Sequence, residues 1–112
     1  MKEKRLENRF LCADLVQINW VTGPGEFRRA EGVLEDISRL GACVQVEESV
    51  PLGTHISITA GENWLSGCVT YCVYREYGYF VGIHFADETT WSSSTFEPQH
   101  LTNLAALSRR TD

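Results

Sequence analysis

The chain has 112 residues, of which 43% are hydrophobic and 22% are charged. This length predicts one domain that buries roughly 65% of its unfolded surface, so a core can form without disulfides or metals. The net charge of −5 argues against a general nucleic-acid binder, and no apolar run approaches the ~20 residues of a membrane span.

The first segment, residues 1–10, is expected to be a flexible arm. It carries Lys2, Lys4, Arg5 and Arg9 against Glu3 and Glu7, a net charge of +2, whereas the rest of the chain carries −7. A basic arm on an acidic body could capture a compact anion but could not hold a long polyanion. The alternative is a solvated terminus with no role, since charged termini are common. The arm lacks the apolar stretch of a signal peptide, so we expect a cytoplasmic protein.

Residues 11–86 are expected to form a closed antiparallel barrel of the all-β class. Alternating side chains and Gly or Pro turns predict six strands, at residues 11–20, 29–37, 42–47, around 56–58, 65–73 and 79–85. Closure would remove the exposed edges of the sheet. Residues 75–78 are expected to form the last hairpin loop, in which Gly78 is free to take a positive φ.

Three strands show clear faces in their alternation. One face should hold Ala42, Val44 and Val46, a second Leu65, Gly67, Val69, Tyr71 and Val73, and a third Tyr79, Val81, Ile83 and Phe85. His84 should then point outward.

Residues 87–112 are expected to form a polar connector and a short C-terminal α-helix. Pro98 suits a first helical turn, and Leu101, Leu104, Ala105 and Ser108 follow with helical spacing. This helix could plug one end of the barrel, or it could bind a partner protein.

Four cysteines, Cys12, Cys43, Cys68 and Cys72, raise the question of disulfides or zinc. Cys68 and Cys72 should lie on one strand with their Cα atoms about 13 Å apart, too far for a disulfide or a shared metal ion. The histidines show no metal-binding spacing. We therefore expect four reduced, mostly buried thiols and no metal site.

Two short motifs carry the functional prediction. Arg5 and Arg9 form an R-x-x-x-R pair in the arm, and guanidinium groups bind phosphate oxygens and the guanine edge through paired hydrogen bonds. Asp36, Ser38 and Gly41 form a D-x-S-x-x-G turn. There a carboxylate can accept hydrogen bonds from guanine, a hydroxyl can donate, and a glycine allows close approach of a ligand. Alone, the second motif could simply be a turn stabilised by Asp and Ser side chains.

Together the motifs resemble the PilZ domain family of bacterial receptors for cyclic di-GMP. The resemblance extends to residues 32–46 (GVLEDISRLGACVQV), to Pro51-Leu52-Gly53-Thr54 and to residues 78–85 (GYFVGIHF), and it covers about residues 4–86. It implies a six-stranded PilZ barrel with a C-terminal helix.

The resemblance also implies a site and a function. Arg5 and Arg9 would wrap over cyclic di-GMP, and Asp36, Ser38 and Gly41 would line the surface of the barrel beneath it. Lys4 stands where relatives that bind a stacked ligand dimer often have arginine, which leaves the stoichiometry open. Lys4 and Arg39 are possible further contacts. Ligand binding would be relayed to an unidentified effector protein.

Two other function classes remain. A PilZ-like interaction module that does not bind nucleotide would keep the fold alone. An enzyme is disfavoured because no nucleophile is paired with a base and no carboxylates are paired in a candidate cleft. We expect no catalytic residue and no cofactor, and the oligomeric state is left open.

Overall fold

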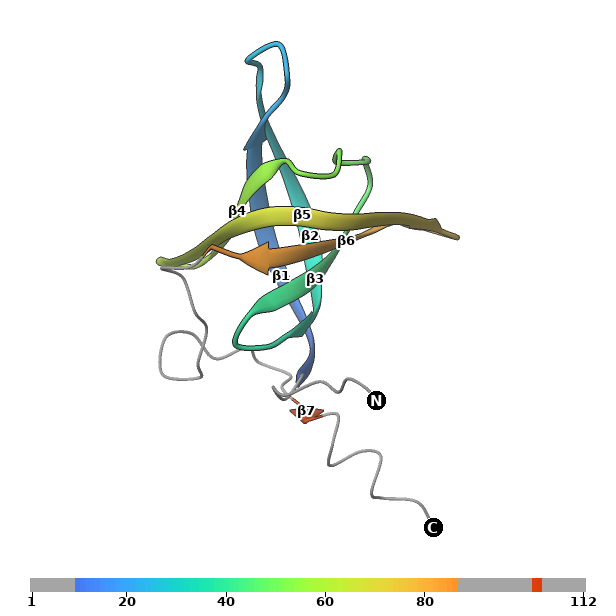
Figure 1. The fold of residues 1–112 in the computed structure, drawn as a ribbon. Coiled ribbons are helices and arrows are strands. Elements are labelled where there is room, and N and C mark those ends of the chain that lie inside the picture. The colour runs from blue at the N-terminus through green and yellow to red at the C-terminus, as the bar shows by residue number, and fades with distance from the viewer. Residues whose placement is uncertain (1–9, 87–101, 104–112) are drawn as a thin grey trace, which may run out of the picture.

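The structure, a computed structural model, describes residues 10–86 and 102–103. Six of its strands lie where the sequence predicts them: β1 (Phe10–Val21), β2 (Phe27–Ile37), β3 (Gly41–Val46), β4 (His55–Ala60), β5 (Asn63–Arg75) and β6 (Gly78–Phe85). The antiparallel pairing runs β1–β2–β3–β6–β5–β4, and β4 pairs again with β1, which closes the barrel (Figure 1). The prediction of an all-β, six-stranded barrel is therefore confirmed.

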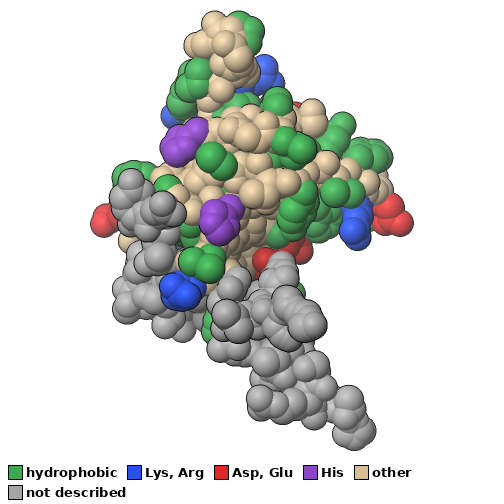
Figure 2. All heavy atoms as spheres, in the orientation of Figure 1, with side chains coloured by type: hydrophobic (Ala, Val, Ile, Leu, Met, Phe, Trp, Pro, Cys, Tyr) green, Lys and Arg blue, Asp and Glu red, His purple; other side chains and the backbone are tan. Residues whose placement is uncertain are grey.

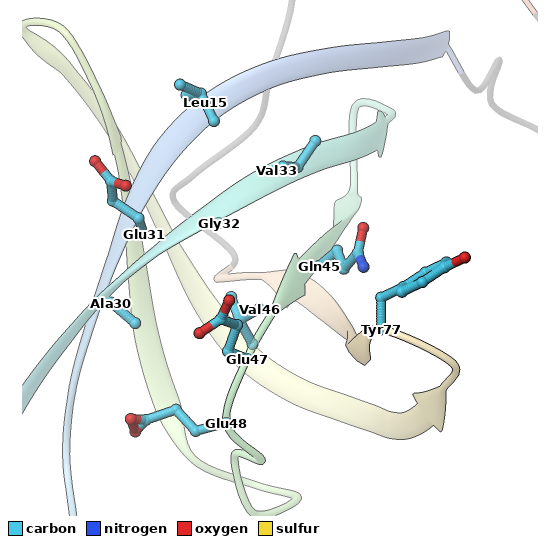
Figure 3. Close-up of a pocket in the computed structure, with 10 residues that line it drawn as sticks. All are labelled: Leu15, Ala30, Glu31, Gly32, Val33, Gln45, Val46, Glu47, Glu48 and Tyr77. Atoms are coloured by element: carbon cyan, nitrogen blue, oxygen red, sulfur yellow. The ribbon is translucent and has the colours of Figure 1, made fainter.

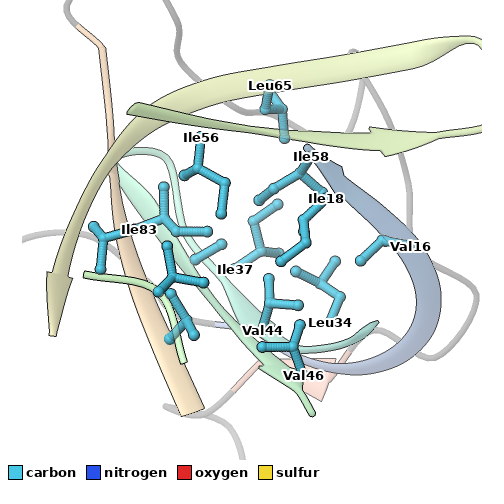
Figure 4. Close-up of a cluster of buried hydrophobic side chains, with 14 of the residues drawn as sticks. Val16, Ile18, Leu34, Ile37, Val44, Val46, Ile56, Ile58, Leu65 and Ile83 are labelled. Atoms are coloured by element: carbon cyan, nitrogen blue, oxygen red, sulfur yellow. The ribbon is translucent and has the colours of Figure 1, made fainter. Parts of the chain in front are cut away.

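The barrel is filled by the inward side chains of all six strands (Figure 4). Ile18, Leu34, Val44, Ile56 and Val81 are fully buried. Each such side chain contributes roughly 1.5–3 kcal/mol when it leaves water.

The residues predicted to share one face of β3, and most of those predicted to share one face of β6, lie in the core. The buried side chains are Ala42, Val44, Val46, Val81, Ile83 and Phe85, while Tyr79 is partly buried against them. His84 is exposed, as predicted. The described residues contain no helix long and apolar enough to cross a membrane.

The predicted face of β5 is wrong in its second half. Leu65, Gly67 and Val69 point inward, but Tyr71 and Val73 are each 41% exposed. The pairing with β6 shifts between Val69 and Tyr71. Thr70 is thus an extra residue on β5, a β-bulge that turns each later side chain to the opposite face.

Gly78 does not adopt the positive φ that the sequence suggested. The glycines with positive φ in the described residues are Gly25, Gly53 and Gly61. Gly78 is instead the first residue of β6, and a Cβ there would lie 2.6 Å from the carbonyl oxygen of Val46. Close packing of β3 against the hairpin, rather than a turn conformation, requires this glycine.

Most of the predicted C-terminal helix lies outside the described residues. Thr102 and Asn103, which fall within it, form the short strand β7 (Thr102–Asn103), and the helix prediction is wrong there. β7 pairs with Leu11 and Phe10 at the start of β1. The pairing of β1 with β4 covers only Gln17–Trp20, so β7 occupies part of an edge that β4 leaves open.

Candidate functional site

The turn between β2 and β3 is held together by Ser38. Its backbone N–H donates to the carbonyl oxygen of Gly41 at 2.8 Å. Its hydroxyl donates to the same oxygen at 3.4 Å and accepts a hydrogen bond from the N–H of Leu40 at 3.3 Å. The side chain is 5% exposed. The hydroxyl therefore stabilises the turn, which is the structural alternative that the sequence left open.

Gly41 also has a structural reason to be glycine. It pairs with His84 of β6, and a Cβ there would lie 2.5 Å from the carbonyl oxygen of Ile83. The N–H of Phe85 donates to the carbonyl oxygen of Leu40 at 2.8 Å, which holds β6 against the turn. The sequence predicted that this glycine lets a ligand approach closely. On the side where a Cβ would stand, it is the backbone of β6 that approaches.

The point where the arm joins the barrel lies beside this turn. Phe10, the last residue of the predicted arm, already belongs to β1 and pairs with Ile37, and Leu11 pairs with Asp36. The three arm residues of the predicted site, Lys4, Arg5 and Arg9, lie outside the described residues.

Irregular strand pairing is concentrated around the same place. In the described residues the register shifts between Leu11 and Asp14 on β1, between Leu34 and Asp36 on β2, and at Thr70 on β5. Bulges re-aim side chains and are frequent next to functional sites. Asp36 borders two of these shifts.

A shallow hollow of about 230 Å³ opens on the outer surface at this point. Its walls come from β2, the turn, β3, β5 and β6, and consist of Asp36, Ser38, Leu40, Gly41, Ala42, Thr70, Tyr71, Gly82, Ile83 and His84. The three predicted barrel residues, Asp36, Ser38 and Gly41, therefore line one hollow. Arg39 is exposed in the turn and does not line it.

Tyr71 gives the hollow an aromatic wall. Its ring lies against the backbone of Gly82, where any Cβ would collide with the ring. The residue is 41% exposed. A tyrosine ring fixed in this way offers a π-face on which a planar base can stack.

The electrostatics around Asp36 are acidic. Burial, and then the charge of Asp36, raises the pKa of Glu35. Burial, followed by the charges of Asp14, Asp36 and Glu35, raises the pKa of Cys12 to about 12, so this thiol stays protonated and unreactive. Such carboxylates attract cations and the N–H edge of guanine, and they repel phosphate.

A larger hollow of about 570 Å³ lies elsewhere, between β2, β3 and the turn that joins β5 to β6 (Figure 3). Glu31, Glu47 and Glu48 project from its walls, and Tyr77 lies across the hollow from them. The carboxylate of Glu48 accepts hydrogen bonds from Arg28 at 2.6 and 2.8 Å. Three glutamates and no lysine or arginine among the residues that line it make this hollow unsuitable for a phosphate ligand.

None of the four cysteines is joined in a disulfide. Cys12 and Cys43 are buried, Cys72 is partly buried and Cys68 is exposed. The expectation of mostly buried thiols thus fails at Cys68. Within residues 10–86 and 102–103, no three His, Cys, Asp or Glu side chains are grouped so as to hold a metal ion.

Sequence reasoning missed Thr70, Tyr71 and His84 as walls of the hollow. The alternating pattern placed Tyr71 on the same face as Val69, which holds only if no residue is inserted at Thr70. Such an inserted residue cannot be recognised from the alternation itself. His84 points outward as expected, yet only its pairing with Gly41 brings it to the turn.

No family model, curated protein or solved structure matches this chain.

Proposed function

We propose that this protein is a PilZ-type cytoplasmic receptor for cyclic di-GMP and relays the signal to an effector protein. Arg5 and Arg9 would contact phosphate and guanine from above, with Lys4 as a further cation. Asp36, Ser38 and Gly41 would form the surface beneath, and Arg39 could add charge at the rim. The proposal includes no catalytic step and no cofactor.

One observation carries this proposal: the junction of the arm with the barrel lies beside the turn that opens on the hollow. Phe10 pairs with Ile37, which stands between Asp36 and Ser38 in the chain. An arm that starts there needs only to fold back to reach Asp36. The register of β1 and β2 thus brings the residue that follows the arm motif next to the turn motif.

The size of the hollow supports a ligand that is shared between barrel and arm. Sites that enclose a whole small molecule usually measure roughly 300–1,000 Å³, and this one measures about 230 Å³. It suits one base and its sugar. The remaining base and the phosphates would be covered by the cationic arm, since the acidic side chains around Asp36 do not favour phosphate.

The hydrogen bonds at Asp36 and Ser38 define their proposed roles. Asp36 accepts from the N–H groups of a guanine edge, and Tyr71 stacks on the base. The hydroxyl of Ser38 has a long bond of 3.4 Å to the oxygen of Gly41. An oxygen of the bound base could replace that acceptor.

Calorimetric titration with cyclic di-GMP tests the proposal. Ordering about half of a nine-residue arm costs several kcal/mol, at roughly 1–2 kcal/mol per residue. Charge-assisted hydrogen bonds return ~1.5–3 kcal/mol each. We expect a dissociation constant near the micromolar range, about −8 kcal/mol, with weaker binding at high salt. Absence of both heat and a shift in melting temperature would refute the receptor function.

A matched pair of variants assigns the binding to the arm. Arg9→Ala should abolish binding and leave the melting temperature nearly unchanged. Arg29→Ala removes the same charge from β2, where Arg29 lies near Phe27 and Asn19 and away from the hollow, and it should bind normally. A large loss of stability in Arg9→Ala would make Arg9 structural.

A non-binding interaction module is the second candidate. It is favoured by the structural duties of Ser38 and Gly41, which explain the turn motif without a ligand. Limited proteolysis separates the two candidates. Cyclic di-GMP should protect the arm of a receptor from cleavage, whereas it should leave the arm of a pure scaffold unchanged.

A further inference from the structure

The hairpin of β5 and β6 projects from the barrel (Figure 1), and no other described strand pairs with the outer edge of its β5 part. β4 pairs with β5 only as far as Cys68. Backbone hydrogen bonds of Val69 with Gly53 and Thr54, at 2.8 and 2.9 Å, extend the contact by one residue. Among the strands of residues 10–86, Cys72–Arg75 pair with β6 alone.

The backbone groups on this edge can be assigned from the hairpin. A two-residue turn, Glu76–Tyr77, closes it at the pair Arg75 and Gly78. The closing pair of such a turn exchanges hydrogen bonds, and the bonding direction alternates along the strand. The N–H and C=O groups of Arg75 and Val73 therefore face β6, and those of Cys72 and Tyr74 face the open edge.

The side chains along this edge are apolar and exposed. Val73 is 41% exposed, Tyr74 65% and Tyr77 82%. On the face drawn in Figure 2, hydrophobic side chains gather on this projecting part of the molecule, and charged groups lie at its tip. Natural edge strands are usually protected by lysine, proline or inward charges. The Cys72-Val73-Tyr74 segment has none of these and is rich in strand-forming residues.

We propose that a second copy of this chain pairs with this edge, antiparallel, about a two-fold axis at Val73. Cys72 of each copy then lies opposite Tyr74 of the other, and both residues already direct their backbone groups outward. The two Val73 side chains meet as a non-hydrogen-bonded pair, the closer of the two kinds of antiparallel pair.

The charges of the edge favour a second copy over a foreign strand. In this register Arg75 lies opposite Tyr71 of the other copy, and Glu76 lies opposite Thr70. No two like charges face each other, and a guanidinium next to a tyrosine ring is favourable. The edge is therefore complementary to itself without any change of side chains. This inference rests on strand pairing and not on the proposed ligand.

Sedimentation equilibrium over a wide range of concentrations tests the dimer. The wild-type chain should dimerise. Val73→Lys and Val73→Glu each place like charges face to face, and each should raise the dimer dissociation constant by roughly tenfold or more. A one-to-one mixture of the two variants places opposite charges together and should restore the dimer.

Two controls keep the result interpretable. Thermal melting shows whether each variant folds. Because Val73 is exposed, we expect that both variants do. Val21→Lys changes another exposed valine, at the far end of β1, and should dimerise as the wild type does. A wild-type chain that stays monomeric to millimolar concentration overturns the proposal. So do Val73 variants that dimerise normally, or a mixture that does not recover.

Discussion

The two halves of β5 are alike in their residue types, but they differ in strand pairing and in burial. From Asn63 to Cys68 the strand pairs with β4, and from Gly67 it also pairs with β6, while Leu65, Gly67 and Val69 are buried in the core. From Tyr71 to Arg75 it is paired with β6 alone among the described strands, and Val73 and Tyr74 are exposed. The first half contributes to the core of the barrel. The second half contributes to the wall of the candidate site and to the exposed edge of the hairpin.

Thr70 separates these halves. One extra residue exchanges the inner and outer faces, because side chains alternate with a period of two. Its hydroxyl donates to the carbonyl oxygen of Gly82 at 3.3 Å across the bulge. The change places Tyr71 over Gly82, next to the turn that carries Ser38. The bulge thus converts a core strand into a wall of the candidate site.

The largest expected effect comes from Gly67 in the first half. A Cβ there would collide with the backbone of His84 and Phe85, which cannot yield as a side chain could. Gly67→Ala should therefore lower the free energy of unfolding by about 3 kcal/mol, measured by urea denaturation.

A matched glycine provides the control for Gly67. A Cβ added at Gly23 would meet no atom within 4 Å, and Gly23 has no positive φ, so Gly23→Ala should leave stability unchanged or slightly higher. Equal losses in the two variants would show that glycine content, not packing at Gly67, sets the cost.

The second prediction compares valines on either side of Thr70. Val69 is 2% exposed and Val73 is 41% exposed. Val69→Ala removes two buried methyl groups and should cost about 2 kcal/mol of stability. Val73→Ala should cost no more than about 0.5 kcal/mol. Measured at a concentration where the chain is monomeric, equal costs would mean that the bulge does not separate the two environments.

The barrel was predictable because its signals are local. Alternation in β3 and β6 needs only period two, and Gly or Pro stands in or next to each turn. The strand positions, and the residues that share a face with Val44 and with Val81, therefore followed from the sequence. Gly78 and Tyr71 could not be assigned correctly, because the first depends on the position of β3 and the second on a single inserted residue. The short pairing of β7 with Phe10 and Leu11 likewise depends on which edge β4 leaves open.

The candidate site was predictable only in part, for the same reason. Asp36, Ser38 and Gly41 are close in sequence, and they share a hollow in the structure. His84 and Tyr71 reach that hollow through pairings between strands distant in the chain. Residue types can indicate chemistry, but only register shows which distant strands contribute to one surface.

The third prediction concerns Tyr71 in the second half of β5. If its ring stacks on a base, Tyr71→Ala should weaken cyclic di-GMP binding by roughly tenfold, since stacking contributes ~1–3 kcal/mol per base. Tyr77→Ala removes a more exposed ring from the hairpin turn, outside this hollow, and should bind normally. Titration of both variants, with melting curves as a check on folding, would separate stacking from a general loss of aromatic surface.

The smallest effect concerns Glu35, which lies at the register shift of β2. Burial and the neighbouring Asp36 raise its pKa in the folded state above the ordinary value of 4.5. The folded state therefore holds its proton to higher pH than the unfolded state, and stability falls as the pH rises through that window. Glu35→Gln should remove this slope and stabilise the protein at pH 7 by up to about 0.5 kcal/mol. Glu62→Gln, in the exposed turn between β4 and β5, should leave the profile unchanged. If the two variants give the same unfolding free energies between pH 4 and pH 7, the register shift of β2 imposes no electrostatic cost on Glu35. The bulges in this barrel would then differ from regular strand pairing only in geometry.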